Sequence, residues 1–496
     1  MLRWSLTGAA SLILTYAAFI LYNAGQALFG ALLLALAVGI AITFGGVRGY
    51  SWRFVFPALA AVLIFITFPV LYTIYLGFTN YSSFNLLDYE RAVSVLMSNR
   101  AIDKSTEKTF QVGTDTAGYR LWFPDEELTS GPLTLSGDPE TADLIPGVQP
   151  TELLEPRDAI KLRTALQAVE LVEQDGTTLR NSGLRTFAQV TSEYQRLSET
   201  QLKRVSDGAI LTANPKTGFF VTESGEQVPP GWRVYIGTDN FKRIFTNDGI
   251  RSPMLKIFGW TVMFAAISTA LVFALGVTLA VILQWPHLKG KTIYRVLLIL
   301  PYAVPSFISI LVFKGLFNQN FGEINFILDA LFGTSVDWNT NGWSARVMII
   351  IVNTWLGYPY MMLLAMGFLQ GVPEDHKKAA ALEGASAARV FFTITLPQIL
   401  PPFVPMLISA FAFNFNNIVL ILLLTRGGPD RAGTVVPAGE TDILGSFTYR
   451  IAFTDSGTQF GLAGAITLII FLIVAIIAYA NFVAIRRAAN KKRYGV

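Results

Sequence analysis

The stretch GVPEDHKKAAALEGASAARVFFTITLP, residues 371–397, separates two strongly apolar runs at 346–369 and 399–424. The proline and two acids at 373–375 are typical of a helix N-terminus, where a missing N–H costs nothing and negative charge is favoured. The alanines that follow favour helix, and Gly384 interrupts it. We therefore expect a short polar helix along a membrane surface, a turn, and a second helix that enters the bilayer. A plain connector is the alternative.

The flanking runs belong to a chain that is apolar over most of its length. Its 496 residues are 52% hydrophobic and 15% charged, whereas soluble globular proteins carry about 25% charged residues. A helix needs about 20 apolar residues to cross a bilayer. The runs predict an α-helical polytopic membrane protein with about eight transmembrane helices, the first a retained anchor and not a signal peptide. The expected spans are residues 5–23, 27–45, 54–78, 257–284, 295–317, 346–369, 399–424 and 460–485.

Residues 79–255, between the third and fourth expected spans, are polar. They hold 24 of the 34 acidic residues and 18 of the 38 basic ones. Regular aromatic and aliphatic positions favour a folded domain over a disordered loop, and the length suffices for a core. The run at 157–176 predicts a helix, and the pieces GFFVTES and WRVYIG predict strands. We expect an α+β or mostly β extracytoplasmic domain inserted between helices 3 and 4.

Basic residues gather in alternate connections between the expected spans. Under the positive-inside rule these connections and both termini face the cytoplasm, and residues 79–255 lie on the opposite side. The residues that set this orientation are Arg3, Arg48, Arg53, Lys289, Lys291, Arg295, Lys377, Lys378, Arg389, Arg486, Arg487, Lys491, Lys492 and Arg493.

Two spans carry amide side chains, which are expensive in a membrane and usually face a cavity or a partner helix. Asn353, Gly357 and Tyr360 have the spacing of one helix face on the sixth span. Amides suit sugar hydroxyls, aromatic faces suit a pyranose ring, and a glycine lets a ligand approach the backbone. Hydrogen bonding between helices is the other interpretation, and both stay open. A second polar face is expected on the seventh span, formed by Phe413, Asn414 and Asn417.

Pro301 and Pro305 should break or kink the fifth span, because proline lacks the helical N–H and clashes with the preceding turn. Broken helices serve binding or gating in transporters, and a packing kink is the alternative. The spans carry few charged side chains, which favours a neutral substrate or no substrate at all.

Several kinds of chemistry lack support in the sequence. The chain has no cysteine, and His287 and His376 have no ligand partner at helical spacing, so no metal site is expected. Residues 290–292 read Gly-Lys-Thr, but Trp285 stands where a phosphate-binding loop needs its first glycine. We expect no catalytic residue and no cofactor on this chain. Its basic residues are explained by topology, so no nucleic acid is expected as a partner.

The stretch 371–397 resembles the EAA loop of ABC importer permeases, in which Glu-Ala-Ala is followed by a glycine and by Ile-x-Leu-Pro. Lys378 replaces the glutamate, and Glu383 holds the acidic position before the glycine. The resemblance implies a coupling helix that docks on a separate ATPase subunit, where ATP and Mg²⁺ would bind. The matching residues are Ala379, Ala380, Gly384, Ile394, Leu396 and Pro397. The expected coupling residues are Lys378, Ala379, Ala380, Glu383, Gly384 and Ala385.

The segments YRVLLILPYAVPSFISILVFKGLFNQNFGEIN, VNTWLGYPYMM, FAFNFNNIVLILLLTRGGPD and TYRIAFT resemble the larger membrane permease subunit of maltose/maltodextrin ABC importers. This is the MalF type of the binding-protein-dependent transport permease family. The resemblance implies alternating access and a sugar site. In such relatives position 410 carries a serine, whereas this chain has Ala410 with Ser409 beside it, so the exact sugar stays open. The implied substrate-binding residues are Asn353, Leu356, Gly357, Tyr360, Phe413, Asn414 and Asn417.

The resemblance also implies partners in the bacterial inner membrane. They are a second permease subunit (MalG type), a dimer of ATPase subunits (MalK type), a periplasmic sugar-binding protein and membrane lipid. An importer of another neutral oligosaccharide, such as trehalose, is the alternative. A secondary transporter or a membrane enzyme is less favoured, since the spans show no ion-coupling acids. The expected parts are 1–78 with helices 1–3, 79–255 as the periplasmic domain, 256–485 as the permease core with its coupling loop 371–397, and 486–496 as a basic cytoplasmic tail.

Overall fold

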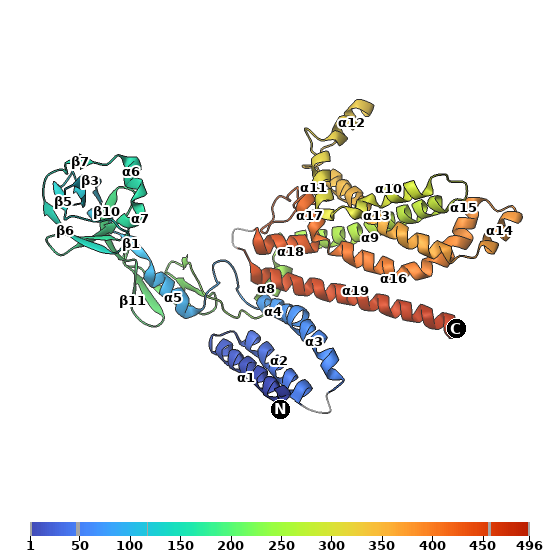
Figure 1. The fold of residues 1–496 in the computed structure, drawn as a ribbon, viewed down its shortest axis with the longest axis horizontal. Helices are drawn as coiled ribbons and strands as arrows, with labels where there is room; N and C mark the ends of the chain where they lie inside the picture. The colour runs from blue at the N-terminus through green and yellow to red at the C-terminus, as the bar shows by residue number, and fades with distance from the viewer. Residues whose placement is uncertain (1, 46–49, 117, 455–457, 495–496) are drawn as a thin grey trace. The chain divides into compact units, whose positions relative to one another are not determined.

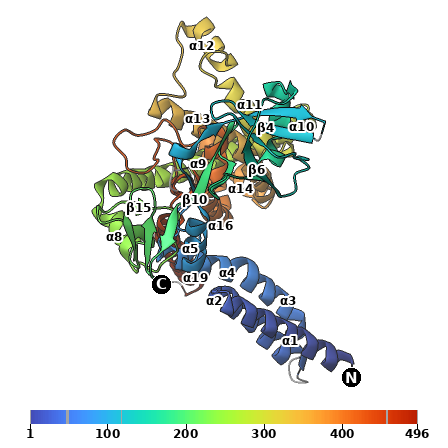
Figure 2. The same ribbon diagram turned by 90° about the vertical axis from the view of Figure 1, so that its left-hand side faces the viewer.

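The chain folds into two compact units, the first Met1–Ser83 with Tyr235–Val496 and the second Phe84–Val234. The first unit is helical and the second is mostly β (Figures 1 and 2). Arg48, used above for the orientation, lies outside the described residues, as do residues 495–496 of the tail. The computed structural model describes residues 2–45, 50–116, 118–454 and 458–494.

The first unit begins with two apolar helices, α1 Leu2–Asn23 and α2 Ala27–Gly45, which pack along each other. Gly30 permits the close approach, because a Cβ atom there would lie only 3.0 Å from the carbonyl oxygen of Ala18. A third apolar segment follows as one bent run. It consists of α3 Trp52–Val62, a π-helical turn Leu63–Thr67 and α4 Phe68–Gly77.

The rest of the first unit is built around two long helices, α9 Asp248–Gln284 and α13 Gly342–Gln370, which pack against each other. Further helical segments complete this part of the unit. They are α8 Asp239–Thr246, α10 Lys291–Ala303, α11 Ser306–Leu316, α12 Glu323–Phe332, α14 Glu374–Leu382, α15 Ala387–Val390, a π-helical turn Phe391–Thr395, α16 Leu396–Phe415, α17 Ile418–Leu424, α18 Leu444–Phe453 and α19 Phe460–Tyr494.

Among the described residues, six helical segments are long and apolar enough to cross a membrane. The pair α10 and α11 adds a seventh if it counts as one span bent by 93°. The apolar part of α19 in the described residues, Phe460–Ile476, is shorter. The predicted fold class, a polytopic helical membrane protein, is confirmed, with six or seven spans by this measure. The six are Trp4–Asn23, Ala27–Gly45, Trp52–Gly77, Asp248–Gln284, Gly342–Gln370 and Ala387–Phe415.

Two of these spans begin nine or more residues earlier than the sequence predicted. The helix expected from residue 257 starts at Asp248, where the side chain of Asn247 caps it by accepting the Gly249 N–H at 2.9 Å. The span expected at 399–424 is instead Ala387–Phe415. Both starts lie in polar sequence, because capping side chains and not hydropathy decide where a helix begins.

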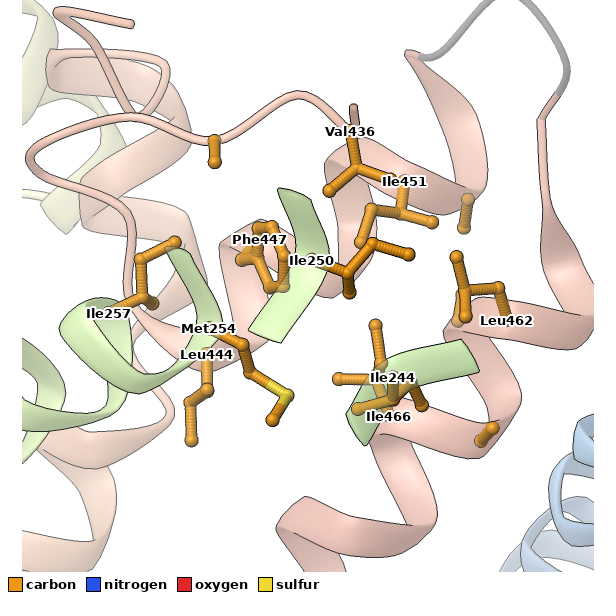
Figure 3. Close-up of a cluster of buried hydrophobic side chains, with 14 of the residues drawn as sticks. Ile244, Ile250, Met254, Ile257, Val436, Leu444, Phe447, Ile451, Leu462 and Ile466 are labelled. Atoms are coloured by element: carbon orange, nitrogen blue, oxygen red, sulfur yellow. The ribbon is translucent and has the colours of Figure 1, made fainter. Parts of the chain in front are cut away.

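A buried apolar cluster joins α8, α9, α18 and α19 (Figure 3). Ile244, Ile250, Phe447 and Ile466, one from each of these helices, are fully buried in it. Close van der Waals packing of such side chains holds neighbouring membrane helices together. The cluster therefore ties the start of α9 to the last two helices of the chain.

A buried ion pair closes the loop between α17 and α18. The carboxylate of Asp442 is fully buried and accepts hydrogen bonds from the Gly439 N–H at 2.8 Å and the Ser446 hydroxyl at 2.8 Å. It also accepts from Arg450 Nη1 at 2.7 Å, and Arg450 Nη2 donates to Asp430 at 2.6 Å. Because a buried charge without a partner is costly, this network fixes the loop on α18.

The second unit holds two sheets. The ten-stranded sheet runs β1-β10-β9-β8-β6-β5-β4-β3-β7, with β2 beside β10, and the five-stranded sheet runs β11 to β15 in chain order. Helix α5 Tyr89–Ser98 packs with the smaller sheet. The strands are β1 Arg100–Ile102, β2 Lys108–Thr109, β3 Gln111–Asp115, β4 Gly118–Phe123, β5 Leu128–Ser130, β6 Glu140–Pro146, β7 Glu152–Leu153, β8 Val169–Val172, β9 Thr178–Asn181, β10 Thr186–Ser192, β11 Tyr194–Arg196, β12 Gln201–Arg204, β13 Ile210–Asn214, β14 Phe219–Val221 and β15 Gln227–Val228.

Part of the local prediction for this unit is wrong. The run 157–176 is not one helix: it forms α6 Pro156–Lys161, α7 Arg163–Leu166 and then strand β8. In β8 the buried Val169 and Leu171 alternate with the half-buried Glu170 and Val172. The strand pairs in parallel with β6, so a long-range partner overrides the local helix preference. The piece GFFVTES does contain a strand, whereas WRVYIG forms only single bridges at Trp232 and Tyr235.

Candidate substrate cavity and coupling loop

A cavity of about 1040 Å³ lies inside the helical unit, beside the breaks between α10 and α11 and between α16 and α17. All seven predicted substrate-binding residues line it, and so do Pro301 and Pro305. Among the described residues, none of the side chains that line it is charged. The polar ones are Tyr302, Ser306, Asn353, Tyr360, Ser409, Asn414, Asn416 and Asn417. The cavity therefore suits a neutral, hydroxyl-rich ligand better than an ion.

Three asparagine amides form a hydrogen-bonded chain along one wall of the cavity. Asn417 Nδ2 donates to Asn353 Oδ1 at 3.2 Å, and Asn353 Nδ2 donates to Asn414 Oδ1 at 3.0 Å. Asn414 Nδ2 in turn donates to Thr269 Oγ1 at 3.1 Å. An amide has two N–H groups and two lone pairs, so each member keeps bonding capacity after these contacts. The sequence allowed two interpretations of these residues, hydrogen bonding between helices and facing a cavity. In the structure they do both.

The polar face predicted on the seventh span differs from the structure. Phe413 is 68% exposed, whereas its neighbour Asn414 is 5% exposed, since successive residues of a helix point about 100° apart. The helix ends at Phe415, and Asn417 is the N-cap of α17, with its side chain accepting the Leu420 N–H. The three residues meet at the cavity because the chain breaks there, and not because they share one helix face.

The role predicted for Gly357 also differs. A Cβ atom at this position would lie 2.9 Å from Cγ2 and 3.1 Å from Cγ1 of Val272 on α9. The missing side chain therefore serves the close packing of α13 on α9. Gly357 still borders the cavity with its backbone.

The remaining predicted residues present rings and small groups to the cavity. Tyr360 is 43% exposed, and its hydroxyl has only a long contact of 3.9 Å with Met406 Sδ. Ser409 borders the cavity beside Ala410, and its hydroxyl donates to the Pro405 carbonyl of its own helix at 3.0 Å. A sugar could use that hydroxyl as an acceptor without breaking the helical contact.

The fifth span breaks at Pro305, as predicted, whereas Pro301 lies inside α10. α10 ends at Ala303, and Pro305 is the N-cap of α11 after a 93° bend. The break exposes Tyr302 and Ser306 to the cavity, two residues that the sequence analysis missed. Their places directly after Pro301 and Pro305 are the signal that could have identified them, because interrupted helices line binding cavities in transporters.

The expected coupling loop is a helix, a turn and a second helix. α14 begins after Pro373, carries two acids in its first turn and has no buried residue. Gly384 has φ +80°, a left-handed conformation that favours glycine, and Ser386 then caps α15 by accepting the Arg389 N–H. α14 thus projects from the unit as an exposed surface helix.

Two charged residues of α14 pair along its surface. Lys378 Nζ lies 3.0 Å from Glu374 Oε2, and the hydrogen bond from this lysine lowers the pKa of the Glu374 carboxyl. The lysine in place of the usual glutamate therefore gives the helix an internal partner for an acid in its first turn. The sequence analysis overlooked Leu382, at the end of α14, which is 90% exposed. A single exposed apolar side chain is common on protein surfaces, but Leu382 lies within the predicted coupling segment 378–385.

A set of apolar spans, two of them broken beside a neutral cavity, together with an exposed surface helix, defines a membrane permease. Family models agree: that of the binding-protein-dependent transport system inner membrane component matches residues 273–487, and that of the MalF P2 domain of the maltose transport system permease matches residues 87–237.

Relatives of known name match almost the whole chain. The maltose/maltodextrin transport system permease protein MalF of Vibrio cholerae is 44% identical over 493 residues, covering 97% of this chain and 94% of that protein. MalF of Escherichia coli is 44% identical over 501 residues, covering 98% of this chain and 96% of that protein. The chain therefore belongs to the MalF family of permease proteins. A solved bacterial ABC transporter involved in alginate import has a chain that superposes with a TM-score of 0.44 at 19% identity, covering 51% of this chain and 84% of that chain.

Proposed function

We propose that this chain is the membrane-spanning permease subunit of an ATP-driven ABC importer and moves maltose and maltodextrins across the bacterial inner membrane by alternating access. The observation that carries the proposal is the cavity of about 1040 Å³, lined by amides, hydroxyls and aromatic rings with no charged side chain among the described residues. The names of the relatives point to the same substrate class.

The cavity would bind the sugar through two kinds of contact. The free N–H groups and lone pairs of Asn353, Asn414 and Asn417 would bond to sugar hydroxyls. The exposed rings of Tyr360 and Phe413 would pack on the apolar face of a pyranose. Leu356 and the backbone of Gly357 would complete the wall.

Coupling to ATP would act through the loop 371–397. In this proposal the residues from Lys378 to Ala385 contact an ATPase subunit of the MalK type, present as a dimer, which holds the ATP and Mg²⁺. Closure of that dimer would pull on α14, and the break between α10 and α11, with Pro301 and Pro305 beside it, would let the cavity walls move. A bound sugar can bias the inward and outward states only by its difference in affinity for them.

The remaining assignments follow from charge and family. The termini and the tail 486–496 would face the cytoplasm, residues 79–255 would form the periplasmic domain, and residues 1–78 and 256–485 would form the membrane part. A second permease subunit of the MalG type and a periplasmic sugar-binding protein would complete the importer.

Uptake of radiolabelled maltose tests this function. The host cells should lack their own maltose permease and express this chain with its partner subunits and binding protein. We expect uptake that unlabelled maltotriose competes away and that Asn353→Leu abolishes. Thr354→Val is the matched control, because the Thr354 hydroxyl donates at 2.7 Å to a carbonyl of its own helix and does not border the cavity. An assembled complex that takes up neither maltose nor maltotriose would overturn the proposal.

Because position 410 is alanine, we also propose a second candidate function, an importer of another neutral oligosaccharide such as trehalose. A hydroxyl at position 409 in place of 410 points about 100° away on the helix. Competition of maltose uptake by trehalose, measured in the same cells, separates the two candidates.

A further inference from the structure

The amide chain beside the cavity ends on a residue that does not border the cavity. Thr269 of α9 is buried, is hydrogen-bonded to Asn414 and is not among the residues that line the cavity. Its hydroxyl oxygen accepts Asn414 Nδ2 at 3.1 Å. The Thr269 hydroxyl is therefore linked to the cavity lining through the amide of Asn414.

The direction of this chain is set at its other end. Asn417 Oδ1 accepts the backbone N–H of Leu420 at 3.4 Å, as the N-cap of α17. A backbone N–H can only donate, so the oxygen of Asn417 turns towards the helix and its Nδ2 towards Asn353. Each following amide then accepts on its oxygen and donates from its nitrogen, through Asn353 to Asn414. The last group must be an acceptor, and Thr269 provides it.

We infer that Thr269 is a positioning residue for substrate recognition. As the terminal acceptor, it holds the Asn414 amide in the orientation that the Asn417 cap sets, and hence maintains the pattern of donors and acceptors that a sugar meets. This inference rests on the proposed function, because it assigns a role in the same cavity. None of the sequence patterns identified Thr269, which lies in an apolar helix.

Two substitutions separate the hydroxyl from the shape of the side chain. Thr269→Val keeps the branched shape but removes the acceptor. A buried N–H of Asn414 then has no hydrogen-bond partner, and rotation of the amide would relieve that cost. Thr269→Ser keeps the acceptor and loses one methyl group. Thr278→Val is the matched control on the same helix, because the Thr278 hydroxyl is exposed and donates only to the Ala274 carbonyl at 2.7 Å.

The experiment measures ATP hydrolysis by the complete importer, reconstituted with its partner subunits and binding protein, against the concentration of added sugar. Maltose, maltotriose and trehalose are each titrated, and all variants are compared with the sugar that stimulates the wild type. We expect Thr269→Val to raise the half-saturating sugar concentration about tenfold, the order expected for one lost hydrogen bond. Thr269→Ser and Thr278→Val should stay within about twofold of the wild type, and hydrolysis without sugar should be unchanged in all three.

Each other outcome has a fixed meaning. An unchanged half-saturating concentration in Thr269→Val overturns the inference. Equal rises of the half-saturating concentration in Thr269→Val and Thr269→Ser would show a structural role and overturn the inference. The same holds if Thr269→Val and Thr269→Ala both fail to assemble while Thr278→Val assembles. A wild type that responds only to trehalose refutes maltose as the substrate in the proposed function, but leaves the comparison of variants valid. A wild type that responds to no sugar refutes both.

Discussion

Adding one methyl group to Gly357 tests how α13 packs on α9 beside the cavity. The new Cβ would lie 2.9 Å and 3.1 Å from the two methyl carbons of Val272, closer than normal contact. Valine in a helix strongly prefers one rotamer, so Val272 cannot simply rotate away. Overpacking costs about 1–3 kcal/mol, and alanine gains about 1 kcal/mol over glycine in a helix. We expect Gly357→Ala to lower the free energy of unfolding by roughly 0–2 kcal/mol.

A second substitution isolates the contact. Val272→Ala removes both clashing carbons and on its own should cost about 1–3 kcal/mol, the usual range for two buried methyl groups. The double variant should be more stable than the sum of the two changes by about 1–3 kcal/mol. Gly367→Ala is the control on the same helix, because a Cβ there meets no atom within 4 Å, and it should be neutral or slightly stabilising.

The assay is the melting temperature of the purified protein in detergent, with sugar uptake measured in parallel. Packing predicts that Gly357→Ala lowers both and that adding Val272→Ala restores uptake. Additive melting temperatures, or a gain in stability equal to that of Gly367→Ala, would refute the packing argument. Uptake lost in Gly357→Ala and not restored by Val272→Ala would mean that the glycine serves the ligand instead.

Four further changes have expected outcomes. Asp442→Ala leaves Arg450 without its fully buried partner and should cost about 3 kcal/mol, visible as a lower yield of folded protein; a normal yield would contradict this. Tyr360→Ala removes an exposed ring and should raise the half-saturating sugar concentration about tenfold, with an unchanged melting temperature. An unchanged half-saturating concentration would show that Tyr360 does not contact the sugar. Leu382→Asp should leave the melting temperature unchanged, because the side chain is 90% exposed, but lower sugar-stimulated ATP hydrolysis several-fold; full stimulation would argue against a contact there. Lys378→Ala breaks only an exposed ion pair and should leave the melting temperature unchanged; a clearly lower melting temperature would contradict this.

The spans of the helical unit and the break in the fifth could be predicted from hydropathy and from the positions of prolines. Apolar runs of sufficient length located the spans, and Pro301 and Pro305 located the break in the fifth, because both effects are local to the chain. The break before α17 escaped notice, since the apolar run continues through it. There the side chain of Asn417 competes for a backbone N–H, which a hydropathy profile does not register.

Features that depend on distant partners could not be predicted. Strand β8, Val169–Val172, pairs with β6, and its local sequence gave a helix signal. The need for a glycine at 357 comes from Val272, which lies on another helix. Thr269 bonds to Asn414, far away in the sequence. The candidate amides were identified from their cost in a membrane, but their bonding order follows only from the fold.

The central claim is that a sugar in the cavity controls ATP hydrolysis through the loop 371–397. Its most direct test is maltose-stimulated ATP hydrolysis by the reconstituted importer carrying Gly384→Val. Position 384 has φ +80° and open space around it, so a branched residue strains the turn without a clash. Gly290→Val is the control, since Gly290 has φ +72° outside this loop. We predict stimulation in the wild type and in Gly290→Val that is lost in Gly384→Val; undiminished stimulation in Gly384→Val would contradict the claim.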